Sequence, residues 1–106
     1  EDADREKFAV IFCDSQNRVT GSEVVSIGTL NASLVHPREV FKAAILKSSA
    51  SVILVHNHPS GDVTPSREDL ELTDRMVKAG KIIGIEILDH LILGDEFLSF
   101  KERGLF

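Results

Sequence analysis

The chain has 106 residues and a formal net charge of −5 at pH 7, with 42% hydrophobic and 27% charged residues. This length fits one compact domain spanning residues 1–106 and leaves no room for a second. The composition is typical of a globular protein with a hydrophobic core. No apolar run approaches the roughly 18–20 residues that span a bilayer, and no segment resembles a signal peptide, so no membrane partner is expected.

The charge distribution argues against nucleic-acid binding by this segment alone. Nucleic-acid-binding domains usually present a basic face, because neutralising phosphates drives their affinity. Here 12 Lys and Arg residues are outnumbered by 17 Asp and Glu residues, and the basic residues are interleaved with acids along the chain. We therefore do not expect a nucleic acid as the partner of this domain.

The first part of the chain predicts a hairpin. Residues 7–13 are a near-continuous apolar run, which indicates a buried strand. A turn cluster at residues 14–17 separates it from a second strand at residues 18–28, and residues 29–34 are expected to add a short strand. The single cysteine, Cys13, cannot form an internal disulfide. We expect it to be a buried thiol in a reduced, cytoplasmic protein.

A helix and a buried strand come next. Pro37 fits the first helical position, and an apolar stripe continues through Lys47. Residues 51–58 read as a buried strand that ends in polar residues, and a polar loop at residues 59–65 follows.

The last part of the chain predicts a helix and two strands. Ser66 opens the second helix, which is expected to end before Gly80. Residues 85–93 predict a strand, and residues 97–100 a last short strand. Because helices and strands intermix, the economical architecture is a mixed sheet covered by helices.

Three potential metal ligands gather at the end of the central strand. His56 and His58 are two residues apart, so they project from the same face of a strand. Asp69 lies in the first turn of the next helix, and the intervening loop is long enough to fold that helix start over the strand end. Two imidazoles and one carboxylate leave a fourth tetrahedral position for water, which is the pattern of a catalytic zinc site.

Structural explanations exist for each of these residues taken alone. Ser66 and Asp69 have the spacing of a capping box and need no metal to account for their positions. A single buried histidine is more often a hydrogen-bonded core residue than a ligand. Two histidines on one face of an apolar strand are harder to explain in this way, because burying both imidazoles requires polar partners. The combination therefore favours a metal site.

These residues resemble the JAMM signature of the JAB/MPN family. The match consists of His56-x-His58, seven residues, Ser66, two residues and Asp69, and the surrounding sequence is similar to the RadC branch. The resemblance implies the cytidine-deaminase-like αβα sandwich with a mixed sheet, a zinc ion, and hydrolysis of a peptide or isopeptide bond. The substrate would then be a peptide or protein.

The resemblance also implies two catalytic residues. Glu6 matches by position the glutamate that acts as general acid and base, and Ser66 matches the serine that stabilises the oxyanion. Glu23, in the second predicted strand, is the other candidate for the proton transfer. We favour Glu6 because its end of the first strand lies beside the metal if that strand runs antiparallel to the His56 strand.

Three further polar residues lie near the predicted site. Asp89 and His90 interrupt an apolar strand, where adjacent residues face opposite ways. A structural polar pair is the preferred interpretation, and a supporting role behind the metal ligands is the alternative. Asp62, in the loop after His58, is interpreted as a turn residue.

Other functions remain compatible with the pattern. A DNA-repair accessory module with a structural metal would fit the RadC name, and the acidic balance argues against it. A non-haem iron oxygenase also uses two histidines and a carboxylate. Zinc deaminase chemistry is disfavoured, because its signature needs paired cysteines and the chain has only Cys13.

Overall fold

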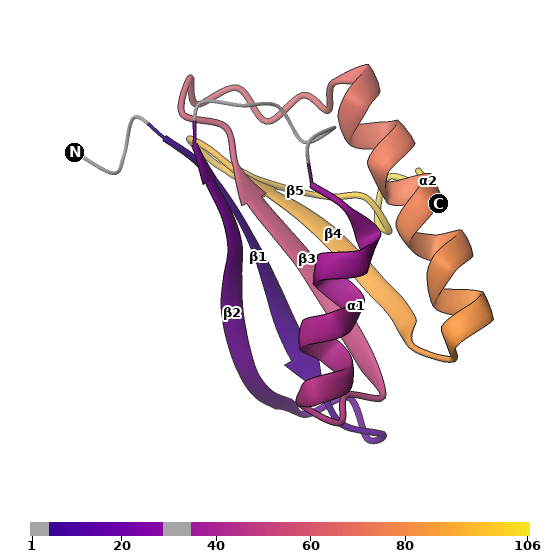
Figure 1. Ribbon diagram of the computed structural model, residues 1–106. Helices are drawn as coiled ribbons and strands as arrows, with labels where there is room; N and C mark the ends of the chain where they lie inside the picture. The colour runs from indigo at the N-terminus through magenta and orange to yellow at the C-terminus, as the bar shows by residue number, and fades with distance from the viewer. Residues whose placement is uncertain (1–4, 29–34) are drawn as a thin grey trace.

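The computed structural model describes residues 5–28 and 35–106 and shows two helices packed on a five-stranded sheet (Figure 1). The elements follow the order β1 (Glu6–Cys13), β2 (Val19–Gly28), α1 (Pro37–Leu46), β3 (Ser51–Asn57), α2 (Arg67–Ile83), β4 (Glu86–Leu93) and β5 (Phe97–Ser99). This is the predicted order of elements. The short strand expected within residues 29–34 lies outside the described residues.

The sheet is mixed, as predicted, with the strand order β2-β1-β3-β4-β5. β1 runs antiparallel to both β2 and β3, whereas β3 and β4 are parallel and are connected through α2. In the β1–β3 ladder, Phe8 pairs with His56. The start of β1 therefore lies beside the carboxyl end of β3.

Both described helices cover the same face of the sheet, and they contact each other. Alternate residues of β1 are buried beneath them, namely Phe8, Val10 and Phe12. Each large apolar side chain that is removed from water contributes about 1.5–3 kcal/mol. The rest of this cluster comes from both helices and from the neighbouring strands: Val35, Val40, Phe41, Ala43, Ala44, Val52, Leu54, Leu72, Met76, Ile85 and Ile87.

The opposite face of the sheet is apolar and only half buried. It carries the alternate residues of the central strands, among them Ala9, Ile11, Ile53, Val55 and Leu91. The predicted α/β class and mixed sheet are confirmed. Within residues 5–28 and 35–106, however, the helices form one layer, and no described helix supplies the third layer of an αβα sandwich. Neither described helix is long and apolar enough to cross a membrane.

The predicted end of α2 was wrong. The helix continues past Gly80 to Ile83, and Gly84 forms the C-cap in the left-handed conformation with φ 89°. The backbone N–H groups of Gly84 and Ile85 both donate to the Gly80 carbonyl, at 2.7 and 3.0 Å. Gly80 is required for packing, because a Cβ there would collide with the backbone oxygen of Ile85.

We predict that Gly80→Ala destabilises the protein by about 1–3 kcal/mol, because the added Cβ overpacks the contact with Ile85. In an unconstrained helix interior the same change would stabilise by about 0.5–1 kcal/mol. Urea unfolding followed by circular dichroism measures the difference.

Gly84 provides the comparison, because an added Cβ there meets no atom within 4 Å and the cost is purely conformational. Gly84→Asn should recover part of the stability that Gly84→Ala loses, since Asn tolerates the left-handed region. Gly80→Asn should be no more stable than Gly80→Ala, because its Cβ meets the same Ile85 oxygen. A Gly80→Ala variant as stable as the wild type would contradict the packing argument.

Candidate metal centre

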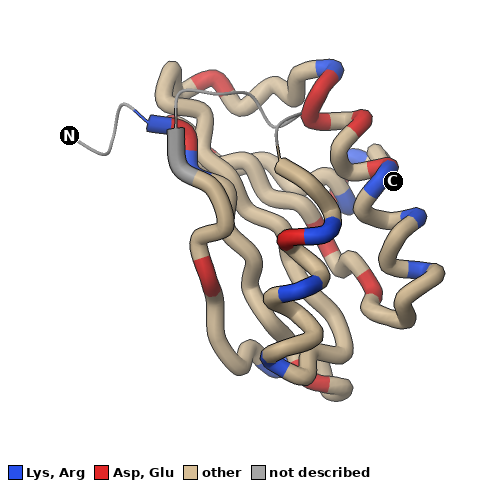
Figure 2. The backbone as a smooth tube through the Cα atoms, viewed as in Figure 1, with Lys and Arg blue, Asp and Glu red and all other residues tan. Residues whose placement is uncertain are grey.

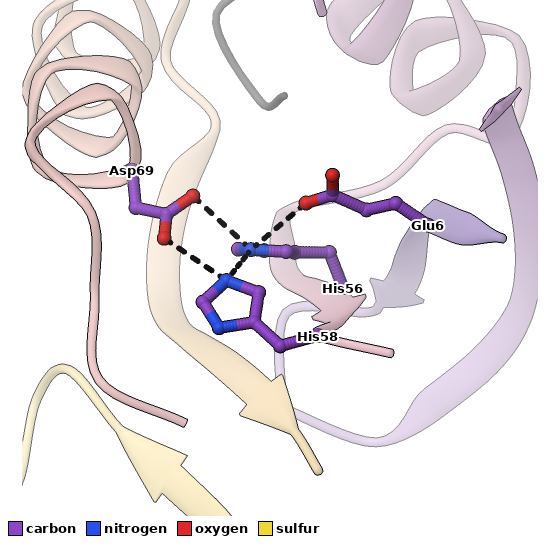
Figure 3. A group of neighbouring side chains, drawn as sticks. All are labelled: Glu6, His56, His58 and Asp69. Carbon is purple, nitrogen blue, oxygen red and sulfur yellow. Dashed lines mark hydrogen bonds and ion pairs between the residues drawn. The ribbon is translucent and has the colours of Figure 1, made fainter. Parts of the chain in front are cut away.

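Four titratable side chains converge where β1 begins, β3 ends and α2 begins (Figure 3). Glu6 is the first residue of β1, His56 lies near the end of β3, and His58 follows that strand directly. Asp69 comes from the first turn of α2. One ligand atom from each of the four residues lies within 4.8 Å of the other three. Three segments of the fold thus present nitrogen and oxygen donors to one point.

The donor atoms are closely spaced. His56 Nε2 lies 3.1 Å from His58 Nε2 and 3.1 Å from Asp69 Oδ1. His58 Nε2 lies 3.1 Å from Asp69 Oδ2, and Glu6 Oε2 lies 3.6 Å from His56 Nε2. Figure 3 shows both imidazole rings pointing toward the carboxylates.

These separations fit the coordination sphere of a metal ion. Ligand atoms around a tetrahedral zinc with bonds of about 2.0–2.1 Å are about 3.3–3.4 Å apart. Around an octahedral ion with similar bonds they are about 2.9 Å apart. The observed 3.1 Å separations lie between these values. The cluster can therefore hold a divalent metal ion, and the spacing alone does not select the element.

Asp69 is the most constrained member of the cluster. Its side chain is 1% exposed, and its Oδ2 accepts a hydrogen bond of 2.8 Å from the Ser66 backbone N–H. Burial raises the pKa of Asp69, but its close contact with His56 and the hydrogen bond from the Ser66 backbone N–H outweigh burial and hold the pKa far below 3.8. The carboxylate is therefore ionised, and Oδ1 is free of the capping box and faces His56.

His58 has its ring orientation set by the loop. Its Nδ1 lies 2.8 Å from the backbone carbonyl of Asp62. Because a carbonyl only accepts, Nδ1 must donate, and Nε2 of the neutral ring is left unprotonated toward Asp69. The Asp62 carboxylate accepts bonds from the backbone and hydroxyl of Thr64, as expected of a turn residue.

Glu6 lies at the more open side of the cluster, with its side chain 19% exposed. Burial raises the pKa of Glu6 above 4.5, while His56 and His58 oppose part of this rise. The antiparallel β1–β3 pairing, on which the preference for Glu6 depended, is present. Glu23 is exposed on β2 and pairs with Val10, and it is not part of the cluster of four.

Ser66 is placed beside the cluster and has its predicted capping role. Its Oγ accepts a hydrogen bond of 3.0 Å from the Asp69 backbone N–H, completing a capping box. Sequence reasoning thus placed the serine correctly at the helix start, and its catalytic role stays a prediction.

Two buried residues behind His56 extend the site. His90 Nε2 lies 2.8 Å from His56 Nδ1, and His90 Nδ1 lies 2.5 Å from Thr73 Oγ1. Burial, aided by the neighbouring His56, lowers the pKa of His90 from 6.5 to about 3. His90 is therefore neutral. Asp89, on the other face of β4, instead accepts bonds from Ser99 and from backbone N–H groups.

The preferred sequence interpretation of Asp89 and His90 holds only for Asp89. The two residues are not partners within a structural pair, because the His90 ring turns toward His56. Thr73 was missed altogether. The available signal was its position four residues after Asp69, on the same face of α2.

Comparison of the sequence with known proteins places the chain in a family. A profile described as "RadC-like JAB domain" matches residues 1–105. The chain belongs to this family. The clustered residues of this RadC-like JAB domain are those that the JAMM resemblance singled out, with Glu6 beside them.

Relatives of this RadC-like JAB domain are named UPF0758 proteins. One from Methanosarcina acetivorans is 59% identical over 101 residues, which are 94% of this chain and 44% of that protein. One from Desulforamulus reducens is 60% identical over 105 residues, covering 98% of this chain and 46% of that protein. One from Geobacillus thermodenitrificans is 60% identical over 101 residues, covering 94% and 45%. The chain spans less than half the length of these relatives.

We predict that the metal-free chain loses stability as the pH falls from about 6.5 toward 3. His90 has a folded pKa of about 3 against 6.5 in the unfolded chain, so the unfolded state binds more protons in this window. Its stabilising contribution is present above pH 6.5 and falls by about 1.4 kcal/mol per pH unit below it. Asp69 acts in a separate window, below its ordinary value of 3.8.

Urea unfolding in the presence of a chelator at pH 7, 6 and 5 measures this dependence. Wild type should lose about 2 kcal/mol more than His90→Gln between pH 7 and 5. His36→Gln is the matched control, because His36 is exposed and outside the cluster. Equal pH dependence of the wild type and His90→Gln would show that His90 is not the titrating group.

Proposed function

We propose that this domain is a zinc-dependent hydrolase that cleaves a peptide or isopeptide bond with an activated water molecule. The observation that carries the proposal is the cluster of His56, His58 and Asp69 with the Glu6 carboxylate beside them. Three protein ligands leave one coordination position of a tetrahedral metal open for water, and an adjacent acid can transfer the proton of that water.

Zinc is proposed from the donor set. Two neutral imidazole nitrogens and a carboxylate oxygen suit zinc, which has no redox chemistry of its own. Membership in the JAB family supports the same choice. When bound, zinc lowers the pKa of a coordinated water to about 7 and polarises a carbonyl group. Non-haem iron uses a similar donor set, so metal analysis decides between the two.

Glu6 is the proposed general acid and base. Its carboxylate faces His56 at 3.6 Å and is partly exposed, whereas Asp69 is buried and engaged in the capping box. The raised pKa of Glu6 brings its proton affinity closer to that needed for transfer near neutral pH. Glu6 would accept the proton of the attacking water and return it to the leaving amine.

Ser66 is proposed to stabilise the developing oxyanion. Its Oγ accepts from the Asp69 backbone, which leaves the hydroxyl proton available, and the described residues show no acceptor for it. A hydroxyl donor beside an oxyanion stabilises the transition state more than the ground state. The capping bond would hold Oγ at the start of α2 during this step.

A nucleic-acid role is less well supported for this domain. In the view of Figure 2, Lys and Arg residues are interspersed with Asp and Glu residues along the described backbone. The net charge is −5. Phosphate neutralisation, the main source of such affinity, is therefore weak here. The part of the longer relatives that lies outside this domain is free to have other partners.

We predict one zinc ion per chain, lost in both His56→Ala and Asp69→Ala. The core under α1 and α2 supplies most of the stability, so both variants should still fold. Asp69→Ala also removes one of the two capping-box bonds, the one that Asp69 Oδ2 accepts from the Ser66 backbone N–H, at a cost of about 1 kcal/mol. Inductively coupled plasma mass spectrometry of the purified chain gives the metal content.

Asp74→Ala is the matched control, because Asp74 is exposed on the same helix and pairs with exposed Lys78. It should retain the metal. Stoichiometric zinc in both site variants would overturn the ligand assignment. Stoichiometric iron in the wild type, with activity that needs dioxygen, would replace the hydrolase by an oxygenase.

We predict that Glu6→Gln keeps zinc and lowers hydrolysis by about 10²–10⁴-fold, the usual contribution of a general acid–base residue. Glu23→Gln, on the exposed surface of β2, should leave hydrolysis unchanged. Cleavage of a defined library of peptides and isopeptide-linked peptides is followed by mass spectrometry, with zinc content measured in parallel. Loss of zinc in Glu6→Gln would identify Glu6 as a ligand instead.

A further inference from the structure

A chain of buried hydrogen bonds runs behind His56, away from the clustered carboxylates. It connects His56 Nδ1 to His90 Nε2 at 2.8 Å and His90 Nδ1 to Thr73 Oγ1 at 2.5 Å. Thr73 Oγ1 continues to the backbone carbonyl of Asp69 at 3.0 Å. All three side chains are essentially inaccessible to water. Every proton along this chain must therefore be matched to an acceptor within it.

The far end of the chain fixes its direction. The Asp69 carbonyl can only accept, so it takes the single hydroxyl proton of Thr73. Thr73 Oγ1 must then accept from His90 Nδ1–H. A neutral imidazole carries one N–H, so His90 Nε2 is an acceptor and receives the Nδ1 proton of His56. In a neutral His56 ring, which carries a single N–H, Nε2 is then unprotonated.

The opposite direction is incompatible with a metal ligand. If Thr73 donated to His90 Nδ1, His90 Nε2 would carry the proton and donate to His56 Nδ1. His56 would then be protonated on Nε2, which would donate to Asp69 Oδ1 at 3.1 Å. The lone pair needed for coordination would be lost. The direction of a single hydroxyl thus sets whether Nε2 of His56 presents a lone pair or a proton to the metal site.

We propose that Thr73 and His90 are positioning residues that hold His56 in the tautomer with its proton on Nδ1. In His58, a single hydrogen bond from Nδ1–H to the Asp62 carbonyl holds the same tautomer. His56 is enclosed by the stacked ring of Phe8, and its nearest polar partner on this side is another imidazole. His90 and Thr73 are therefore needed to connect His56 Nδ1 to a backbone carbonyl, that of Asp69.

The hydrogen-bonded chain His56–His90–Thr73, here called the relay, ends close to the metal site. It ends on the backbone of Asp69, whose carboxylate faces His56 Nε2. Thr73 and Asp69 are one helical turn apart on α2, so the first turns of this helix fix both sides of the His56 ring. Phe100 stacks on His90 with ring centroids 4.3 Å apart and limits rotation of that ring. The proposal rests on the proposed metal function, because this tautomer matters only if His56 Nε2 binds a metal ion.

Zinc affinity in Thr73→Val tests the relay, because valine keeps the shape of threonine and removes the hydroxyl. We expect binding 10- to 100-fold weaker, about the usual effect of losing an outer-sphere partner. Thr73→Ser, which restores a hydroxyl, should bind within a few-fold of the wild type. Thr20→Val is the matched control, because Thr20 lies on β2 and donates to the Phe12 carbonyl, at the opposite end of β1 from Glu6. Competition with a chromogenic chelator measures each affinity, and wild-type affinity in Thr73→Val would overturn the proposal.

The tautomer itself is measured without any substitution. Imidazole ¹⁵N chemical shifts of the metal-free wild type should show His56 protonated on Nδ1 and unprotonated on Nε2, and His90 likewise. A protonated His56 Nε2 would overturn the proposal, whatever the variants do. Absence of zinc and iron binding in the wild type would instead refute the proposed function, and the ¹⁵N shifts would still decide the direction of the relay.

Discussion

The buried carboxylate of Asp69 is the constraint on which the site depends. An ionised group with 1% exposure requires compensation, and within the described residues no Lys or Arg provides it. Its partners are two imidazole nitrogens at 3.1 Å and the amide of Ser66. The same residue therefore starts α2 and places a negative charge beside Nε2 of both histidines. A divalent cation would satisfy all three groups at once.

The topology of the sheet makes this convergence possible. Because β1 is antiparallel to β3, Glu6 enters the sheet at the end where His56 leaves it. Because β4 is parallel to β3 and follows α2, the helix must begin above that same end and run back along the sheet. His90 then pairs with Leu54 and lies one strand away from His56. The directions of β1, β3 and β4, with α2 as the connection, thus bring Glu6, His56 and His90 to the same region of the fold.

The sequence predicts the parts of this site that depend on local spacing. Alternation places His56 and His58 on one side, and the capping-box spacing places Asp69 at a helix start. Alternation also shows that Asp89 and His90 face opposite ways, but which of them faces inward depends on the register of β4 against β3. Thr73 is an ordinary helical residue until the tertiary structure places His90 against it. The end of α2 was misjudged because a packing glycine and a capping glycine have the same local signal.

The two sides of the cluster differ in exposure. Under the proposed function, the buried side would hold the metal ion and the more exposed side would meet the substrate. His56 and Asp69 are closed off by Phe8, the relay and the capping box, whereas the side chains of Glu6 and His58 are 19% and 17% exposed. Among the four clustered residues, Glu6 and His58 form the side on which a metal ion bound here would meet solvent. Under the proposed function, the substrate carbonyl must therefore approach beside Glu6, where its carboxylate can reach both the attacking water and the leaving amine. The rigid, inaccessible half of the site fixes the geometry that makes this approach productive.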